Sequence, residues 1–214
     1  MPQALIFDMD GVIVDSEPLH LLATQGALAM IGRNLSEEEY YRRYVALTDR
    51  ELFEILLGRE DPQVEHLVIE KQRLYRELAA SGVKPYRATV AFIERAQEVL
   101  PLAVATGATR EEAEEALKRL GIRDAFRIVV SAEDYERGKP DPAPYLLAAH
   151  LLGVPPSRCV VIEDSKEGVK AAKAAGMLCI ALTHTHATAE LAYADLVLDS
   201  LGGLDPRELL SRFP

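Results

Sequence analysis

Short apolar runs alternate with longer amphipathic segments along most of the chain. The apolar runs have the length and composition of strands buried on both faces, whereas the segments between them place apolar residues at helical spacing. The predicted strands cover residues 4–7, 102–105, 128–130, 159–162, 178–182 and 196–198. Strands that alternate with helices of this length predict right-handed crossovers and a parallel sheet covered by helices on both faces. The predicted fold class is therefore α/β.

The helices expected between these strands begin at capping signals. Thr109-Arg110-Glu111-Glu112 is a capping box, and Asp141-Pro142 pairs an N-cap residue with a proline suited to the first helical turn. The predicted helices cover residues 89–100, 109–120, 141–152 and 165–175, with a short helix from residue 187 and a final one from residue 206.

Residues 16–83 show helical spacing without any strand-like alternation. Helices are predicted over residues 17–31, from a capping box at residues 36–39, over residues 49–57 and over residues 62–80. This segment is therefore expected to form an all-helical domain inserted into a core made of residues 1–15 and 84–214. The first strand needs partners for its backbone, so we expect it to lie inside the sheet of the core.

Composition and charge narrow the choice of function. The 214 residues are 49% hydrophobic and 27% charged, which is typical of a globular protein. A net charge of −10 argues against nucleic-acid binding, which needs clustered Lys and Arg. No apolar run approaches the ~20 residues of a membrane span, and the N-terminus lacks a signal-peptide pattern. We therefore expect a cytoplasmic protein with no membrane partner; the sequence leaves the oligomeric state open, with a monomer favoured. Cys159 and Cys179 lie in apolar runs and are expected to be core residues.

The first predicted strand ends abruptly in two carboxylates. Asp8 and Asp10 are two residues apart, so an extended backbone through Met9 would place them on the same side, and Gly11 lets the chain turn away. Other polar groups follow later strands: Thr106, Lys139, Glu163 and Asp164. In a parallel sheet these strand ends share one edge, where α/β folds place their ligands, so we expect the groups to converge.

Each of these residues also has an ordinary structural interpretation. Asp8 and Asp10 would fit an Asp-Gly turn, and Thr106 a turn residue. Lys139 would be solvated, and the Glu163-Asp164 pair would favour the N-terminus of the next helix through its dipole. The functional interpretation depends on the joint placement of the groups.

Together, the converging groups would suit phosphoryl transfer. Asp8 and Asp164, with Glu163 as a further candidate, offer the hard oxygen ligands that Mg²⁺ prefers, while Lys139 supplies a positive charge and Thr106 a hydroxyl donor. An ionised Asp8 would attack phosphorus, and Asp10 would protonate the leaving oxygen and later deprotonate a water. The partner expected from this chemistry is a small phosphorylated substrate.

The segments Asp8 to Ser16, Thr106, Lys139-Pro140 and Glu163-Asp164-Ser165 resemble, in order and spacing, the four motifs of the haloacid dehalogenase superfamily. The chain is most similar to the branch with a helical cap, which includes β-phosphoglucomutase and small phosphomonoester phosphatases. The resemblance implies a Rossmann-like core and a mobile helical cap. It also implies Asp8 as nucleophile and Asp10 as general acid and base. Mg²⁺ would then be held by Asp8, the Asp10 carbonyl and Asp164, and the phosphate by Thr106, Gly107 and Lys139.

The same resemblance suggests substrate contacts from the cap. His20, Arg50 and Lys71 resemble cap residues of β-phosphoglucomutase, although Arg50 and Lys71 would also fit as surface charges on helices. Three hypotheses follow: a Mg²⁺-dependent phosphatase of a small metabolite such as a sugar phosphate, a β-phosphoglucomutase-type mutase, and a non-catalytic binding protein on the same scaffold. The intact set of acids with Lys139 argues against the third.

His184-Thr185-His186 follows the predicted strand at residues 178–182. Paired imidazoles often bind metals, but no third ligand lies nearby in the sequence. We therefore expect an exposed loop here.

Overall fold

The structure, a computed structural model, describes residues 1–45 and 47–213. The chain divides into two compact units. One unit combines Met1–Asp15 with Pro85–Pro214, and the other is the segment Ser16–Lys84.

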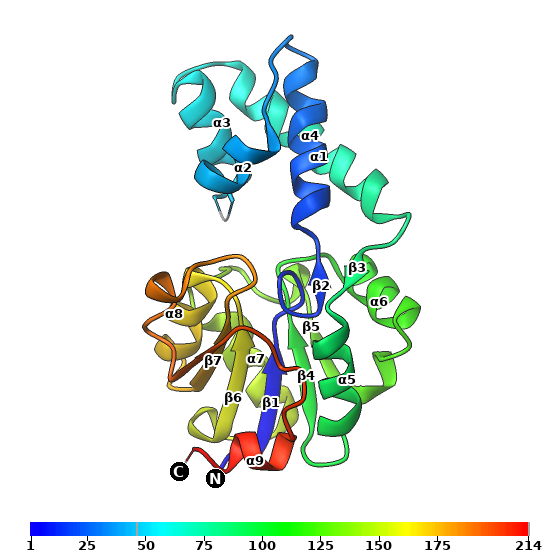
Figure 1. The fold of residues 1–214 in the computed structure, drawn as a ribbon, viewed down its shortest axis with the longest axis vertical. Coiled ribbons are helices and arrows are strands. Elements are labelled where there is room, and N and C mark those ends of the chain that lie inside the picture. The colour runs from blue at the N-terminus through cyan, green and yellow to red at the C-terminus, as the bar shows by residue number, and fades with distance from the viewer. Residues whose placement is uncertain (46, 214) are drawn as a thin grey trace. The chain divides into compact units, whose positions relative to one another are not determined.

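The first unit is built on a parallel sheet, as predicted. Its strands are β1 (Ala4–Phe7), β4 (Leu102–Ala105), β5 (Phe126–Val130), β6 (Cys159–Glu163), β7 (Leu178–Leu182) and β8 (Leu196–Leu198). In the described residues they form one six-stranded sheet in the order β5-β4-β1-β6-β7-β8 (Figure 1). Strand β1 pairs in parallel with both β4 and β6. The strand that precedes the helical insert therefore lies in the middle of the sheet, as its need for backbone partners required.

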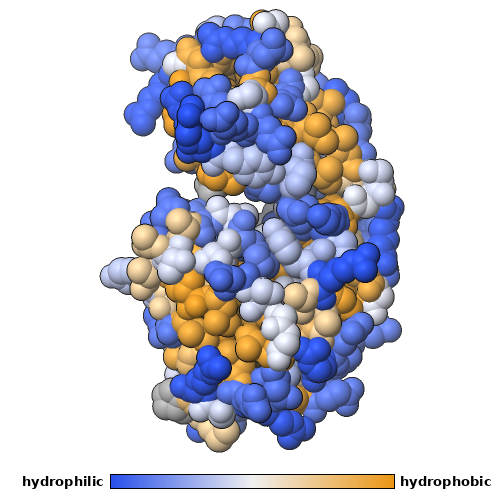
Figure 2. Space-filling model, viewed as in Figure 1, coloured by the Kyte–Doolittle hydropathy of each residue, from blue (hydrophilic) through white to orange (hydrophobic). Residues whose placement is uncertain are grey.

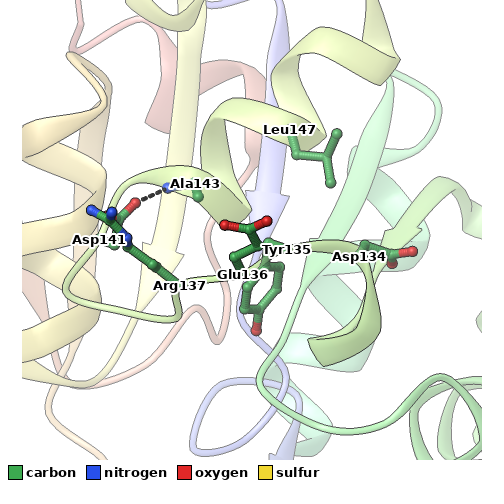
Figure 3. Close-up of a pocket in the computed structure, with 7 residues that line it drawn as sticks. All are labelled: Asp134, Tyr135, Glu136, Arg137, Asp141, Ala143 and Leu147. Atoms are coloured by element: carbon green, nitrogen blue, oxygen red, sulfur yellow. Dashed lines mark hydrogen bonds and ion pairs between the residues drawn. The ribbon is translucent and has the colours of Figure 1, made fainter.

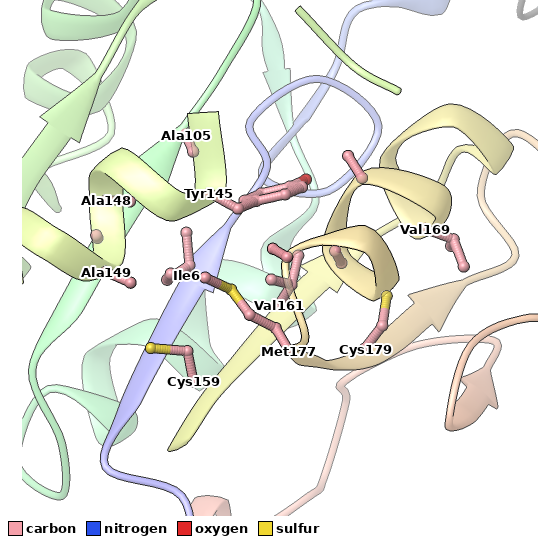
Figure 4. Packing of buried hydrophobic residues seen from close by; sticks show 14 of the residues in the cluster. Ile6, Ala105, Tyr145, Ala148, Ala149, Cys159, Val161, Val169, Met177 and Cys179 are labelled. Carbon is pink, nitrogen blue, oxygen red and sulfur yellow. The ribbon is translucent and has the colours of Figure 1, made fainter. Parts of the chain in front are cut away.

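Helices cover both faces of this sheet. Ala4 and Ile6 of β1 pack into a cluster with residues of α7 (Ala143–Leu152) and α8 (Lys166–Ala174) (Figure 4). Phe7 belongs to the opposite face, where its ring contacts Phe92 of α5 (Arg87–Ala96) at a centroid distance of 6.4 Å. Side chains alternate between the two faces of a strand, so these contacts confirm the predicted α/β layers.

The other helices of this unit are α6 (Arg110–Arg119), α9 (Pro206–Leu210) and the 3₁₀ turns η1 (Arg123–Ala125), η2 (Ala132–Asp134), η3 (Pro156–Arg158) and η4 (Thr188–Glu190). Among them, α6 and α9 were predicted, whereas the 3₁₀ turns η1, η2 and η3 were not. The Thr109 capping box is present, with Glu112 bonded back to the Thr109 backbone. The helix expected from residue 187 is only the 3₁₀ turn η4. Helix α5 begins two residues before the predicted start and ends at Ala96, after which the chain continues in turns.

A small second sheet was not predicted. It pairs β2 (Val14–Asp15) with β3 (Lys84–Pro85), at the two ends of the inserted segment. Strands of two residues are too short to produce a recognisable alternation of polar and apolar positions.

Apart from Lys84 in β3, the regular structure of the second unit is helical over its described residues. Its helices are α1 (Glu17–Ala29), α2 (Glu37–Arg43), α3 (Asp49–Leu57) and α4 (Gln63–Ala79). They enclose a hydrophobic core that includes Leu28, Phe53 and Leu67. At the start of α2 the Ser36 side chain caps the Glu39 N–H, but the Glu39 carboxylate contacts Arg43 instead of completing the expected box.

On the face seen in Figure 2, hydrophobic residues are exposed over part of the unit that carries the sheet, with hydrophilic residues around them. Exposed hydrophobic side chains of this kind are ordinary on globular proteins. Among the described residues, no helix has both the length and the apolar character that crossing a bilayer requires.

Candidate active site

The register of the central strands brings three carboxylates together. Phe7 of β1 lies opposite Ile162 of β6, so Asp8 and the Glu163-Asp164 pair leave the sheet at the same edge. The Asp8 N–H donates to the Ile162 carbonyl at 2.9 Å, which fixes the backbone where the strand ends. Carboxylate oxygens of Asp8, Glu163 and Asp164 lie within 4.8 Å of one another, and all three residues are buried. The structure thus brings together acids that are far apart in the sequence.

Lys139 joins this cluster. Its Nζ lies 2.7 Å from Asp8 Oδ1 and 2.8 Å from Glu163 Oε1, and its side chain is only 14% exposed. The ammonium group also lies 5.0 Å from the centroid of the Tyr145 ring. Lys139 is therefore a largely buried counter-ion of the acids, and the solvated alternative is wrong.

Glu163 is fully buried and accepts hydrogen bonds on both carboxylate oxygens. Oε1 accepts from Lys139 Nζ and from the Tyr145 hydroxyl, at 2.8 and 2.7 Å. Oε2 accepts from the N–H groups of Asp164 and Ser165, both at 2.8 Å, and from the Ser165 hydroxyl at 2.9 Å. The Ser165 hydroxyl in turn caps α8 by accepting from the Gly168 N–H at 3.1 Å. Glu163 therefore ties Lys139 to the start of this helix.

Two glycines make room for the acids. A Cβ on Gly168 would lie 1.6 Å from Glu163 Oε1, and a Cβ on Gly11 would lie 1.9 Å from Asp164 Oδ2. Gly11 also has a φ of +73°, in the left-handed region that favours glycine. Both carboxylates thus occupy space that any larger residue would fill.

The pKa values of the acids reflect their burial and their mutual repulsion. Burial raises the pKa of Asp8 to about 7; Lys139 opposes this shift, and Glu163 and Asp10 add to it. Burial and the neighbouring carboxylates of Glu163 and Asp8 raise the pKa of Asp164 well above its usual value. Burial acts in the same direction on Glu163, but Lys139 and the other donors hold its pKa below the ordinary value. Three buried carboxylates therefore face one ammonium group, and a divalent cation would complete the charge balance.

Asp10 lies in the turn that follows Asp8. The Met9 carbonyl accepts from the N–H groups of Ile13 and Val14, at 2.8 and 3.0 Å, so the chain folds back directly after the strand. Asp10 itself forms a β-bridge with Val14 and is half-buried. Its carboxylate contributes to the raised pKa of Asp8, which places the two acids within electrostatic reach.

Thr106 follows β4, the other neighbour of β1. It is fully buried, its hydroxyl oxygen accepts from the Ala108 N–H at 3.0 Å, and its carbonyl accepts from the Tyr135 hydroxyl at 2.8 Å. These contacts are typical of a turn residue, the ordinary structural interpretation of Thr106. They use the hydroxyl oxygen only as an acceptor, so its proton can be donated to another group. Gly107 is exposed.

A surface pocket of about 460 Å³ lies beside the segment that carries Lys139 (Figure 3). It is lined by Asp134, Tyr135, Glu136, Arg137, Asp141, Ala143 and Leu147. The acids of the cluster are not among these lining residues, so this pocket is separate from the carboxylate cluster.

The predicted cap residues lie in two different environments. Lys71 is buried, with its Nζ 2.6 Å from Asp49 Oδ1 and 2.7 Å from His20 Nδ1. An ammonium group only donates, so Nδ1 of His20 accepts and the ring is neutral. Burial, with the charge of Lys71, lowers the pKa of His20 to about 3. Arg50, in contrast, is 55% exposed and forms ion pairs with Glu54 and Glu65.

Sequence reasoning missed several residues around the acids. Tyr145 was expected only as part of a helix, and Thr185 as part of an exposed loop, yet both hydroxyls donate to carboxylates of the cluster. A residue on a helix at core spacing carries no sign that its hydroxyl reaches a buried acid. Similarly, nothing near Lys71 in the sequence indicated Asp49 as its partner.

Comparison with known proteins identifies the family of the chain. The family model of the haloacid dehalogenase-like hydrolases matches residues 5–182. A phosphorylated carbohydrates phosphatase of Thermotoga maritima is 35% identical over 181 residues, covering 82% of each chain. The fructose-1-phosphate phosphatase YqaB of Escherichia coli is 36% identical over 174 residues, covering 81% of this chain and 92% of that protein.

The same likeness is seen in three dimensions. The crystal structure of CbbY from Rhodobacter sphaeroides in complex with phosphate has a TM-score of 0.77 to this chain at 29% identity. The match covers 95% of this chain and 96% of the other. With a family model that spans most of the chain and relatives of this similarity, the resemblance seen in the motifs is confirmed: the chain belongs to the haloacid dehalogenase-like hydrolases.

Proposed function

We propose that this chain is a Mg²⁺-dependent phosphatase that hydrolyses a small phosphorylated metabolite, such as a sugar phosphate, through a phospho-Asp8 intermediate. The observation that carries the proposal is the placement of Asp8. Its carboxylate is buried at the end of the central strand, 2.7 Å from Lys139 and next to Asp164. The substrate class is supported by the relatives that are named phosphatases of phosphorylated carbohydrates and of fructose 1-phosphate.

The acids fit a divalent cation. Asp8 and Asp164 offer carboxylate oxygens, and we place the Asp10 carbonyl with them as a third ligand. The oxygens of Glu163 already accept from Lys139, Tyr145, Ser165 and two backbone N–H groups, so its role is to orient its neighbours. When bound, Mg²⁺ would neutralise charge on the acids and on the substrate phosphate.

In the first half of the reaction, Asp8 attacks phosphorus and the bond to the leaving oxygen breaks. Asp10 donates its proton to that oxygen, so the alcohol leaves neutral. Lys139 lies beside the attacking oxygen and favours both the ionised form of Asp8 and the negative charge of the phosphoryl group. Thr106 donates its hydroxyl proton to a phosphoryl oxygen, and the adjacent Gly107 leaves space for the group.

In the second half, water attacks the same phosphorus atom. Asp10, now ionised, accepts a proton from this water, and the bond between phosphorus and Asp8 breaks to release inorganic phosphate. The two acids thus return to their starting protonation states. Arg50, Lys71 and His20 remain candidates for contacts with the part of the substrate beyond the phosphate, with Arg50 the most exposed of the three.

A panel of phosphate monoesters, assayed with Mg²⁺ and with a chelator, tests this proposal. We expect Mg²⁺-dependent release of phosphate from at least one sugar phosphate. The panel includes β-glucose 1-phosphate with a trace of the bisphosphate, because a mutase would convert it to glucose 6-phosphate without releasing phosphate. That outcome would replace the phosphatase by the mutase, and no turnover of any ester would leave the non-catalytic alternative.

A further inference from the structure

The segment His184–His186, which follows β7, is not part of the carboxylate cluster but hydrogen-bonds to Asp164 and Gly11 beside it. It is not the exposed loop that the sequence led us to expect: His186 is buried, and His184 and Thr185 are half-buried. The prediction was wrong because each of the three side chains hydrogen-bonds to the segments that hold the acids.

Thr185 contacts Asp164 directly. Its hydroxyl donates to Asp164 Oδ2, and a hydroxyl that donates to a carboxylate forms one of the stronger hydrogen bonds in proteins. Among the described residues, no hydrogen bond of this kind reaches Oδ1 of the same carboxylate. The contact therefore fixes the rotation of the carboxylate and leaves Oδ1 as the oxygen available to a cation.

His184 fixes the backbone of Gly11, the residue against which the Asp164 carboxylate packs. Its Nδ1 lies 2.7 Å from the Gly11 carbonyl, and because a carbonyl only accepts, Nδ1 must carry the proton. The ring also stacks on Tyr86, with centroids 3.9 Å apart and an interplanar angle of 12°. Gly11 is the residue whose missing Cβ makes room for Asp164 Oδ2. His184 therefore fixes the wall against which the Asp164 carboxylate packs.

His186 fixes the backbone of the same residue. Its Nδ1 lies 3.0 Å from the Asp164 carbonyl, so this nitrogen is also a donor. Both imidazoles thus use Nδ1 to hold backbone carbonyls, and neither belongs to the group of potential metal ligands found among the described residues. Thr185 therefore holds the Asp164 side chain, and His186 holds its backbone carbonyl. His184 holds the backbone of Gly11, which packs against the carboxylate.

We propose that Thr185 is a positioning residue that sets the affinity of the Asp8–Asp164 site for a divalent cation, by holding the Asp164 carboxylate in a binding orientation. The inference rests on the proposed metal dependence of the enzyme. Groups that orient a metal ligand typically change metal affinity by about ten- to a hundredfold when they are removed. The effect belongs to cation binding and not to the chemical step, because Thr185 does not contact Asp8 among the described hydrogen bonds.

Binding of Mn²⁺ to the metal-free full-length chain, followed by electron paramagnetic resonance, tests the inference without turnover. Thr185→Val keeps the shape of the side chain and removes the hydroxyl, so we expect the Kd for Mn²⁺ to rise by about tenfold or more. Thr185→Ser restores the hydroxyl and should stay within about threefold of the unmodified chain. If the valine variant does not fold, Thr185→Ala takes its place in the comparison with serine.

Thr183→Val is the matched control. The Thr183 hydroxyl also donates to a carboxylate, that of Asp199 at 2.8 Å, but this acid lies outside the cluster. Its removal should leave Mn²⁺ binding unchanged. A Thr185→Val variant that binds Mn²⁺ as tightly as the unmodified chain, or a Thr183→Val variant that is weakened equally, would overturn the inference.

A kinetic measurement separates this role from a general structural one. In Thr185→Val the Mg²⁺ concentration for half-maximal rate should rise by about tenfold, while kcat at saturating Mg²⁺ is retained. A fall in kcat that excess Mg²⁺ does not restore would contradict a positioning role. If the unmodified chain binds no Mn²⁺ at all, the proposed metal dependence itself fails, and this result is distinct from a failure confined to Thr185.

Discussion

Lys139 Nζ lies between Asp8 Oδ1 and Glu163 Oε1, at 2.7 and 2.8 Å. One of these carboxylates has its pKa raised to about 7, and the other has its pKa lowered, although both are buried. The difference arises from the donors: Glu163 accepts from Tyr145 and from the start of α8 as well as from Lys139. The same lysine therefore has one partner, Glu163, whose ionised form is favoured, and a second, Asp8, whose charge is sensitive to what binds next to it.

Replacing Lys139 by methionine should lower kcat/KM by at least ~10²-fold, since it removes charge stabilisation next to the attacking oxygen. The assay is phosphate release from whichever ester the unmodified enzyme hydrolyses. Lys166→Met is the matched control, because Lys166 pairs with Glu190 on the surface at 2.8 Å. Equal activities of the two variants would contradict the role given to Lys139.

Asp8→Asn should reduce turnover by at least ~10³-fold while the chain stays folded, because a neutral amide cannot attack phosphorus. The variant should show the circular dichroism spectrum of the unmodified chain. Mass spectrometry of the unmodified enzyme, quenched in acid during turnover, should reveal one added phosphoryl group on the peptide that contains Asp8. Asp199→Asn, which alters an exposed acid, should keep full activity. Turnover retained by Asp8→Asn would remove the covalent mechanism.

Sequence reasoning found the elements and residues whose signals are local. The Thr109 capping box, the apolar run that ends at Asp8 and the Asp49–Leu57 helix each depend on neighbouring positions, and the structure has all three. Convergence of the strand ends followed from parallel topology alone. In contrast, the hydroxyl of Tyr145 reaches Glu163 from a helix on one face of the sheet. That contact depends on tertiary packing, which the spacing of apolar residues along the chain does not predict.

The loop after β7 illustrates the same limit. His184 and Thr185 contact Gly11 and Asp164, which are distant from them in sequence, so nothing local distinguishes this segment from a solvent-exposed turn. The paired imidazoles suggested a metal site as the alternative to a loop, but among the described residues neither belongs to a group of potential metal ligands. The small β2–β3 sheet was missed because its strands have only two residues each.

Gly168→Ala should strongly destabilise the core, because the new Cβ would lie 1.6 Å from Glu163 Oε1. Either the helix or the buried carboxylate has to move, and a displaced Glu163 would lose its pairing with Lys139. We expect the free energy of unfolding to fall by at least ~3 kcal/mol, the scale for a buried ion pair that is broken. Denaturant titration measures the change. Gly138→Ala, whose Cβ would make only an ordinary 3.7 Å contact with Tyr135, should lose less than about 1 kcal/mol.

His20 should make the stability of the chain sensitive to mild acid. Its pKa is lowered to about 3 in the folded state, from an ordinary value of 6.5, so the unfolded chain binds the proton first. This contribution to stability is full above pH 6.5 and is lost as the pH falls towards 3. Between pH 7.5 and 5.5 the loss should be on the order of 1 kcal/mol.

The matched variant is His20→Asn, which keeps an acceptor for Lys71 but does not titrate. Its free energy of unfolding should fall less than that of the unmodified chain over the same pH interval, by on the order of 1 kcal/mol, the contribution of His20. Denaturant titrations of both proteins at the two pH values give the comparison. Identical pH dependence would show that His20 is not the group responsible.

Mg²⁺ should stabilise the chain more at pH 8 than at pH 6. The pKa of Asp8 is raised to about 7, so at pH 6 its carboxyl holds a proton that a cation has to displace, and the raised pKa of Asp164 acts in the same direction. Without metal, the effect of Asp8 on the pH dependence of stability is opposite to that of His20. A folded pKa above the ordinary 3.8 contributes stability at low pH that is lost as the pH rises through about 7. Since each displaced proton weakens binding by up to ~tenfold per pH unit, the increase in Tm at a fixed Mg²⁺ concentration should be clearly smaller at pH 6. Asp164→Asn should lose most of the increase at both pH values. An equal or larger increase at pH 6 in the unmodified chain would mean that the cation binds somewhere other than these carboxylates.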